Sequence, residues 1–261
     1  MRDSPYRPTK GRDELPPTSF ADRSLIIADI EERHFWFVAR RDLIKRLLRA
    51  SLGVSGASII DIGCGTGLFV GHLSRTGYRA IGTDININAS HFRKRSARCE
   101  SGFVQSSAMA LPFKAKFFDC ALLLDVLEHV DPAPALVEAR RVLRPSGILL
   151  VTVPAFPWLW SHRDKAAGHR TRFRKESIKD LLARAGFEVE RVHYYQCLLF
   201  PLFVASRLLG RSSRLFSVIE ERPGKMVNRI ATAISRLEVR GTGFVPWPIG
   251  STLVCVARKE G

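Results

Sequence analysis

The sequence predicts an α/β protein built on a doubly wound sheet of seven strands. Short apolar runs alternate with helical patterns along most of the 261 residues, which is typical of a mainly parallel sheet covered by helices on both faces. Segment 57–84 reads strand, glycine-rich loop, helix and strand, which is the order of a βαβ unit. A chain of this length buries a sizeable core, so one such domain with additions accounts for it.

Each element follows from a local pattern. The first predicted helix, 25–52, carries apolar residues on one side and basic residues such as Arg41 and Lys45 on the other. The strands are short apolar runs, as buried parallel strands are. A Pro-Ser-Gly segment at 145–147 ends a helix, and Gly186 is a candidate cap for the next one. The predicted helices are 25–52, 68–75, 89–97, 134–143 and 177–185, and the predicted strands are 57–62, 78–84, 102–105, 118–124, 148–153, 187–194 and 250–257.

Two segments do not fit the alternation of strands and helices. One is 154–175, and the other is 197–248, where a plain doubly wound sheet would have a short hairpin loop. We expect both to lie on the substrate side, since specificity is usually built on such additions to a rigid scaffold. The expected organisation is a disordered tail at 1–20, one domain formed by 21–196 and 249–261, and a helical insertion at 197–248 that acts as a lid.

Composition restricts the partners and the compartment. The chain has 41 Lys and Arg against 25 Asp and Glu, a net charge of +16 that predicts anionic partners: nucleic acid, phospholipid headgroups or a phosphorylated substrate. The five cysteines form no Cys-x-x-Cys pair, which argues against a zinc site or a disulfide framework and favours the reducing cytosol. No apolar stretch reaches the length of about 18 residues that a membrane-spanning helix needs.

The glycine loop after the first strand predicts a nucleoside site. Residues 61–67 have the pattern Asp-x-Gly-x-Gly-x-Gly, and glycines let the backbone turn sharply and approach a ligand closely. Asp84 ends the second strand about 20 residues after Gly63, where a carboxylate can accept the ribose hydroxyls. Asp61 precedes the loop, and an acid there suits a ligand with an ammonium group and would repel a pyrophosphate.

Four patches carry a resemblance to a known family. They are 59–67, 82–84, the Ser107-Ala108 and Leu111-Pro112-Phe113 pair, and 118–130, which reads FDCALLLDVLEHV and is the most specific of the set. Together they resemble the class I S-adenosylmethionine-dependent methyltransferases, especially the branch of ubiquinone biosynthesis. The likeness covers about residues 30–195 and implies a Rossmann-like seven-stranded sheet whose last strand is antiparallel, with a helical insertion before that strand.

The resemblance implies that S-adenosyl-L-methionine is the cofactor. The residues expected to bind it are Asp61, Gly63, Cys64, Gly65 and Gly67 at the methionine part, Asp84 with the adjacent Ile85 at the ribose, Ser107 and Ala108 at the adenine, and Leu124 and Asp125 at the sulfonium side. The family often has Asp where this chain has Ser107, so a weaker or backbone contact to the adenine amino group is expected here.

Three histidines are candidate general bases. His129 follows the fourth strand and therefore comes near the transferred methyl group, while His162 and His169 belong to a polar loop beyond the fifth strand. In the same loop, Arg170 and Arg172 are expected to hold an anionic group of the acceptor. Trp36 belongs to an aromatic segment that resembles the N-terminal cover of this branch. Some related enzymes bind a divalent metal at the strip that contains Asp125, Glu128 and His129, but we predict no metal here.

The acceptor is predicted to be a small hydrophobic or lipid-linked molecule that is methylated on oxygen. The insertion contains an apolar run, 197–209, followed by basic residues interspersed with apolar ones, which is typical of helices that lie on an anionic membrane surface. We therefore expect a cytoplasmic protein that associates peripherally with membranes. The alternative is an RNA methyltransferase, or another that acts on nucleic acid or protein and uses the basic surface. The fourth strand, however, lacks the Asn/Asp-Pro-Pro-Tyr/Phe strip of base-nitrogen methylation, which makes nucleic acid a poor candidate.

Overall fold

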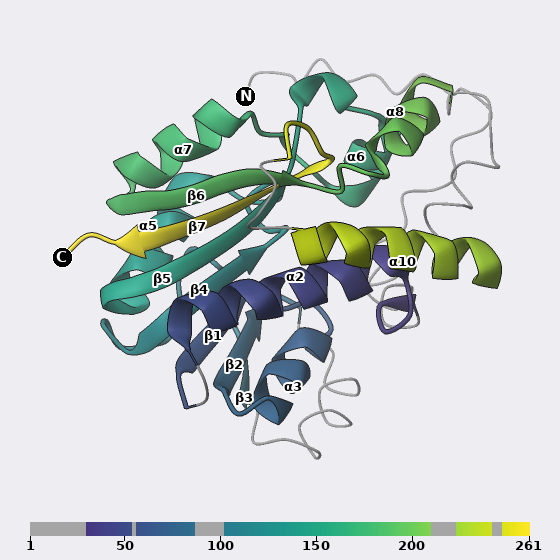
Figure 1. Cartoon of the computed structure of the whole chain (residues 1–261). Coiled ribbons are helices and arrows are strands. Elements are labelled where there is room, and N and C mark those ends of the chain that lie inside the picture. Colours follow the sequence, from purple (N-terminus) through teal and green to yellow (C-terminus); the bar gives the residue numbers. More distant parts are fainter. Residues whose placement is uncertain (1–29, 54–55, 87–101, 210–222, 242–246) are drawn as a thin grey trace, which may run out of the picture.

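The computed structural model describes residues 30–53, 56–86, 102–209, 223–241 and 247–261, and its centre is a seven-stranded sheet (Figure 1). The strands lie in the order β3-β2-β1-β4-β5-β7-β6. Their bounds are β1 Ser58–Ile62, β2 Arg79–Asp84, β3 Gly102–Gln105, β4 Phe118–Leu124, β5 Leu143–Pro154, β6 Phe187–Tyr195 and β7 Thr252–Lys259.

The pairing confirms the predicted doubly wound sheet. Strands β3, β2, β1, β4 and β5 are mutually parallel, whereas β7 is antiparallel to both of its neighbours, β5 and β6. The chain runs outward from β1 to β3 and then returns to place β4 on the other side of β1. The connections that follow β1 and β4 therefore leave the sheet in opposite directions. Ligands of open α/β sheets bind in the crevice between such connections, at the carboxyl ends of the strands.

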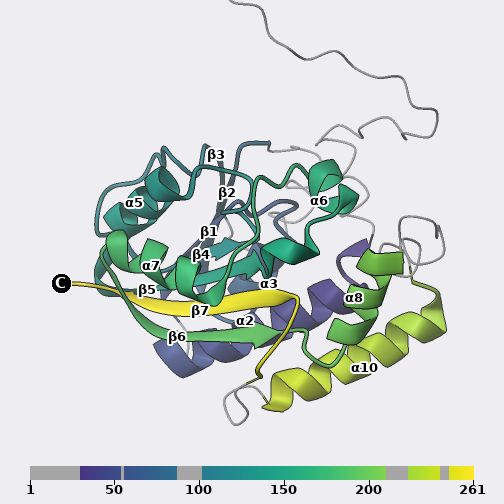
Figure 2. The same ribbon diagram turned by 90° about the horizontal axis from the view of Figure 1, so that it is seen from above.

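Helices cover both faces of the sheet. Helices α5 and α7 pack on one face, while α2 and α3 pack on the other, where α10 adds Val239 (Figure 1). Helices α8 and α10 lie beside α2 at one end of the molecule (Figure 2). The helix bounds are α2 Phe35–Leu52, α3 Leu68–Arg75, α5 Pro132–Val142, α6 His162–Ala167, α7 Lys175–Arg184, α8 Phe200–Leu209 and α10 Lys225–Gly241, and a 3-10 turn, η1, spans Pro157–Leu159.

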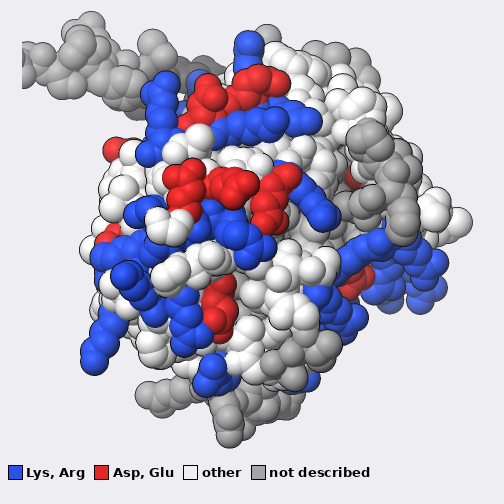
Figure 3. Space-filling view, turned by 60° about the vertical axis from the view of Figure 1, so that its left-hand side comes forward, with Lys and Arg blue, Asp and Glu red and all other residues white. Residues whose placement is uncertain are grey.

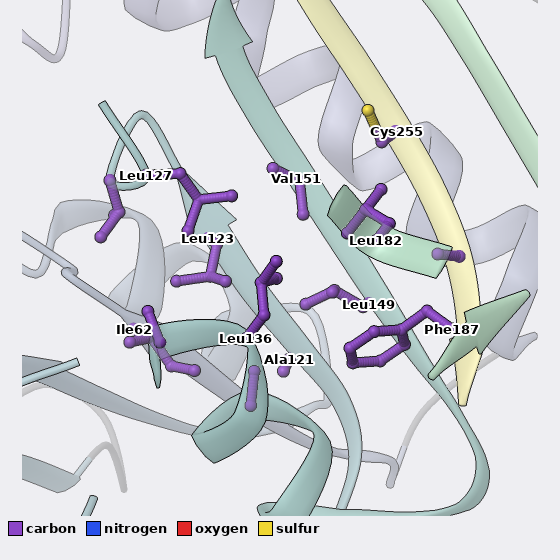
Figure 4. Close-up of a cluster of buried hydrophobic side chains, with 14 of the residues drawn as sticks. Ile62, Ala121, Leu123, Leu127, Leu136, Leu149, Val151, Leu182, Phe187 and Cys255 are labelled. Atoms are coloured by element: carbon purple, nitrogen blue, oxygen red, sulfur yellow. The ribbon is translucent and has the colours of Figure 1, made fainter. Parts of the chain in front are cut away.

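The core is divided between the two faces by the alternation of side chains along each strand. In β4, Leu123 points into the cluster shared with α5 and α7 (Figure 4). Leu122 and Leu124 point to the opposite face, into the cluster shared with α2 and α3. In β5, Val151 and Leu150 divide in the same way. The sheet is thus anchored on both sides by side chains that are almost fully buried.

Truncating one central residue of this core should be costly. Leu123 is fully buried on β4, in the middle of the sheet. We expect Leu123→Ala to lower the free energy of unfolding by about 2–5 kcal/mol, because the change removes buried methyl groups and leaves a cavity. Urea unfolding monitored by circular dichroism measures this loss. As a control, Val137→Ala on α5 should change the stability by less than about 0.5 kcal/mol, because Val137 is 59% exposed.

Several boundaries differ from the predicted ones. The helix predicted over 25–52 is wrong for residues 31–34, because residues 31–33 form a turn and the following helix starts only at Phe35. His34 has extended backbone angles there, and its Nδ1 accepts a hydrogen bond from the backbone N–H of Trp36 at 3.2 Å. The predicted helix 89–97 and the tail 1–20 lie outside the described residues.

The segment between β6 and β7 contributes α8 and α10, which lie outside the layers of the sheet (Figure 2). Phe35 at the start of α2 packs with Leu199 and Ala231 of this segment, and Trp36 and Phe203 pack against that cluster. The segment and the aromatic start of α2 thus form one packed unit. Among the described residues, no helix combines the length and the apolar character that crossing a bilayer requires.

Candidate active site

The glycine loop between β1 and α3 turns through three left-handed glycines. Gly63, Gly65 and Gly67 have φ values of 74°, 57° and 73°. A Cβ at Gly63 would lie 2.5 Å from a methyl carbon of Val126, so this position requires glycine. The loop is fixed to β2 because the N–H groups of Gly63 and Cys64 donate to the carbonyl of Thr83 at 2.7 and 2.9 Å. A Cβ at Gly65 would meet nothing within 4 Å, so the loop leaves space above this residue.

Asp84 lies at the end of β2 and faces this loop. Its buried carboxylate accepts hydrogen bonds from the N–H groups of Gly65 and Asn86, each at 2.9 Å. Burial raises the pKa of Asp84, and these two backbone hydrogen bonds oppose the rise. Ile85 follows with an exposed apolar side chain. An acid and an apolar surface thus meet beside the loop, which fits a ribose with an attached base.

Asp61 is a second buried acid at the end of β1. Burial raises its pKa to about 7, the charge of Arg40 opposes the rise, and the charge of Asp84 adds to it. A cation bound beside Asp61 would favour the ionised form. The site is therefore suited to a ligand that brings a positive charge, as the ammonium group of a methionine moiety does.

This arrangement gives cofactor binding a pH dependence. With a pKa of about 7, Asp61 is mostly protonated at pH 6 and mostly ionised at pH 8. If an ammonium group binds the ionised form, S-adenosylmethionine should bind more tightly at pH 8 than at pH 6. Its dissociation constant should fall by up to about tenfold between these pH values. Titration calorimetry at the two pH values measures this change. Asp61→Asn should bind weakly at both, and a wild-type affinity that is flat with pH would contradict the assignment.

The turn after β3 brings the predicted adenine residues to the same edge. The N–H of Ser106 donates to the carbonyl of Asp84 at 3.0 Å, which ties this turn to the end of β2. The hydroxyl of Ser107 accepts from the N–H of Met109 at 3.2 Å, so it closes its own turn. Ala108, the other predicted residue, is partly buried against the core.

A cover formed by residues 31–40 closes the other side of the loop. Glu31 accepts a hydrogen bond from the hydroxyl of Thr66 in the glycine loop. Arg40 pairs with Asp125, and its guanidinium also lies 4.6 Å from the ring centre of Trp36. A small cavity of about 30 Å³ is lined by residues that include Arg40, Leu68 at the start of α3 and Leu124 of β4. The cover thus contacts the glycine loop through Glu31, while Trp36 lies against the guanidinium of Arg40.

Asp125 is held in an unusual conformation at the end of β4. It has a positive φ of 59°, and its carboxylate accepts a hydrogen bond from Thr152 at 3.0 Å in addition to the pair with Arg40. Thr152 is not predictable from the sequence as part of the site, because a threonine within an apolar strand has the ordinary appearance of a core residue. This conformation and the two contacts fix a carboxylate at the carboxyl end of β4, beside the end of β1.

His129 and His169 meet, although 40 residues of sequence separate them. Their rings are 4.8 Å apart, edge to face, and the N–H of Arg170 donates to the carbonyl of Glu128 at 2.6 Å. The structure thus brings the polar loop after β5 to the strip after β4. His162, in contrast, is the exposed first residue of α6, and among the described residues the ring contact of His129 is with His169.

Asp164 holds His169 in place. It is buried, and its Oδ1 lies 3.0 Å from Nδ1 of His169 and 2.8 Å from Nε of Arg172. Burial alone would raise the pKa of Asp164, but the hydrogen bond from His169 and the charge of Arg172 hold it well below its usual range. Asp164 is therefore ionised and can only accept, so Nδ1 of His169 carries the proton and Nε2 is the basic nitrogen.

The two arginines of this loop have different surroundings. Arg172 is buried and bonded to Asp164 and to the carbonyl of Ala155, so its guanidinium holds the loop together. Arg170 is exposed and stays a candidate for binding an anionic group of the acceptor. Sequence reasoning did not assign Asp164, although Ser161 and Asp164 have the spacing of a capping box, and the structure shows that box at the start of α6.

Three side chains of this region have the donor types of a metal site. One ligand atom each of Glu128, His129 and His169 lies within 4.8 Å of the others. Burial and then the charge of Asp125 raise the pKa of Glu128 well above its usual range. Asp125 is instead paired with Arg40. Burial thus disfavours the ionised form of Glu128 that would bind a cation.

Comparisons with known proteins identify the family of this chain. A family described as "Methyltransferase domain" matches residues 33–192. The chain is 29% identical over 168 residues to a protein of Mycolicibacterium smegmatis named "Probable S-adenosylmethionine-dependent methyltransferase", a match that covers 63% of each chain. It is 31% identical over 129 residues to the ubiquinone biosynthesis O-methyltransferase of Dinoroseobacter shibae, covering 45% of this chain and 52% of that one. The chain thus spans about half to two thirds of these relatives.

Solved structures agree on the fold. Phosphoethanolamine N-methyltransferase 2 of Haemonchus contortus, in complex with S-adenosyl-L-methionine, has a TM-score of 0.61 at 15% identity, covering 95% of this chain and 61% of that one. The [4+2]-cyclase SpnF has a TM-score of 0.52 at 22% identity, covering 84% and 80%. The latter shows that this fold alone does not define a reaction. The match over most of the chain does define the family: the chain belongs to the class I S-adenosylmethionine-dependent methyltransferases.

Proposed function

We propose that this protein transfers the methyl group of S-adenosylmethionine to a hydroxyl oxygen of a small hydrophobic or lipid-linked acceptor. The observation that carries the proposal is the pair Asp164 and His169, which presents a basic imidazole nitrogen beside His129 and next to the cofactor edge of the sheet. An oxygen acceptor must lose a proton as it is methylated, and a histidine with a fixed tautomer can accept it.

In this proposal, one set of residues binds the cofactor and another set accepts the proton of the acceptor. When bound, S-adenosylmethionine supplies a methyl group that is electrophilic because it is attached to a positively charged sulfur. Asp61, Asp84 and the glycine loop would hold this cofactor. Nε2 of His169 would take the proton of the acceptor hydroxyl, and Asp164 would stabilise the resulting imidazolium. Alignment of the two reactants would supply most of the rate enhancement, since good orientation lowers the activation barrier by about 7–11 kcal/mol.

An apolar acceptor fits the side chains around this loop. Phe156 stacks on Tyr194 with ring centres 5.1 Å apart and also contacts Phe200 of α8 at 5.6 Å. Phe156 has a positive φ of 61°, an unusual conformation for a bulky residue. Trp158 in η1 is 57% exposed beside these rings. The aromatic group thus joins the segment after β5 to α8 of the insertion, and its exposed Trp158 favours an acceptor with an apolar part.

The identity of the acceptor can be tested with labelled cofactor. The purified protein is incubated with S-adenosylmethionine carrying a radioactive methyl group and with an extract of the source cells, which is then separated into lipid, aqueous, nucleic-acid and protein fractions. The proposal predicts label in the lipid fraction, bound as an ether that withstands mild alkali, whereas a methyl ester would release methanol. Label in nucleic acid or protein would contradict it and would favour the alternative acceptors.

A further inference from the structure

Helix α10 has two opposite faces of different character. The side that packs against the body of the protein buries Ala231, Ser235, Glu238 and Val239. On the outer side, three large apolar residues lie along one line of the helix: Met226 is 76% exposed, Ile230 51% and Leu237 63%. Packing against the part of the chain that the structure describes does not account for these apolar side chains.

A row of basic residues runs beside the apolar line. Lys225, Arg229, Arg236 and Arg240 are all exposed, and their spacing places them on the same outer side of α10. The single acidic residue of this helix is Glu238, which is buried and accepts hydrogen bonds from the N–H groups of Cys197 and Leu198 at 2.9 and 3.1 Å. The outer side of α10 therefore combines apolar and cationic residues with no carboxylate of its own.

The basic row borders a groove. Its volume is about 620 Å³, and the charged residues that line it are all arginines: Arg33 from the turn before α2, and Arg229, Arg236 and Arg240 from α10. Arg236 also pairs with Asp42 of α2 at 3.0 Å. Leu237 lines the same groove, so apolar and guanidinium groups face one space. Such a groove suits a phosphate that is attached to an apolar chain.

Another side of the molecule shows a different charge pattern. On the side seen in Figure 3, Lys and Arg are interspersed with Asp and Glu. Among the described residues, Arg144 pairs with Asp119, and Arg258 pairs with Glu190 at 2.7 Å. Those basic residues are paired with acids. On α10 Arg236 is also paired, with Asp42, but the basic row as a whole lies beside exposed apolar side chains.

We infer that the outer side of α10 docks this protein on a bilayer surface that contains anionic lipids. Its apolar residues would enter the boundary between headgroups and acyl chains, and its arginines would bind lipid phosphates. Charge alone would also suit a nucleic acid. A nucleic acid, however, would use the arginines and leave Met226, Ile230 and Leu237 in water, while a bilayer uses both sets.

The docking side adjoins the cover of the cofactor site. Asn228 of α10 accepts a hydrogen bond from the N–H of Phe35 at 2.8 Å and donates one to the carbonyl of Arg33 at 2.7 Å. A bilayer bound to α10 would therefore lie next to the aromatic start of α2. The inference does not depend on the proposed acceptor, because vesicle binding is measured without catalysis.

Vesicle flotation tests the inference with matched variants. The full chain is mixed with phosphatidylcholine vesicles, with and without phosphatidylglycerol, at about 0.15 M salt. We expect binding only to the anionic vesicles. The double variant Arg229→Gln, Arg240→Gln should bind about 25-fold more weakly, since each arginine near the surface contributes roughly fivefold. The double variant Ile230→Ser, Leu237→Ser should also lose at least about tenfold. Controls are Lys179→Gln with Arg184→Gln on α7, and Val137→Ser on α5, each expected within twofold of the wild type.

All exchanged residues are exposed, so circular dichroism should show the same fold for every variant. Flotation that is absent with anionic vesicles, or equal for the wild type and both α10 variants, would overturn the inference. The inference would also fail if the serine variant bound like the wild type while short single-stranded RNA was retained through the same arginines. That outcome would identify nucleic acid as the ligand of this side.

Discussion

Replacing His169 by glutamine should lower the rate of methyl transfer by about 10²- to 10⁴-fold, the range that a positioned general base contributes. Glutamine keeps a polar side chain of similar reach but cannot accept a proton at neutral pH. The affinity for S-adenosylmethionine should stay within about twofold of the wild type, because the hydrogen bonds of the glycine loop and of Asp84 do not involve this residue. Transfer is measured as label entering the lipid fraction, and affinity by calorimetry.

Two further variants make this test specific. Asp164→Asn should also reduce turnover, because an amide can donate to Nδ1 of His169 and thereby favour the wrong tautomer. The lower turnover of Asp164→Asn should be accompanied by a shift in the pH dependence of turnover. A purely structural role of Asp164 would not produce such a shift. His162→Gln serves as the matched control, since His162 is an exposed histidine of the same loop. Loss of activity in His162→Gln together with full activity in His169→Gln would refute the assignment.

Replacing Asp84 by alanine should weaken binding of S-adenosylmethionine by about 10²-fold or more. The change removes a buried carboxylate that is placed to accept the ribose hydroxyls, and hydrogen bonds to a charged group contribute about 1.5–3 kcal/mol each. It also frees the N–H groups of Gly65 and Asn86, which Asp84 now binds, and so loosens the glycine loop. Titration calorimetry at pH 8, where Asp61 is ionised, measures the loss.

A carboxylate at the opposite end of the sheet provides the control for this change. Asp119 lies near the start of β4, where it binds the N–H of Ser58 at 2.7 Å and pairs with Arg144. Asp119→Ala should lower stability while leaving cofactor affinity within about twofold. If Asp84→Ala bound the cofactor like the wild type, the ribose assignment would be wrong.

The sequence predicted the sheet well because its strands are apolar runs separated by clear breaks. The glycine loop and Asp84 were also predictable, since local spacing along a βαβ unit fixes where these residues lie. The contact between His129 and His169 was not predictable, because it depends on how the loop after β5 folds back on the residues that follow β4. No local pattern carries that information, and both histidines entered the prediction separately.

The same reason explains the remaining omissions. The role of Arg172 depends on burial, and a basic residue in a polar loop is usually exposed, whereas this one is bound to Asp164 inside the loop. The break in the first helix depends on His34, whose side chain caps α2, a role more often filled by Ser, Thr, Asp or Asn. Sequence patterns predict the roles that a residue type usually has. Arg172 and His34 have roles that are unusual for arginine and histidine.

The position of β7 has a consequence for the evolution and the engineering of this chain. The family match ends at residue 192, yet β5 and β6 are joined only through β7, which is formed by residues 252–259. A fragment cut to the matched region would lack the strand between them and would expose the edge of β5 to association with other chains. Helices α8 and α10 therefore lie, in sequence, between two neighbouring strands of one sheet, β6 and β7, and an engineered replacement of this segment has to keep both strands.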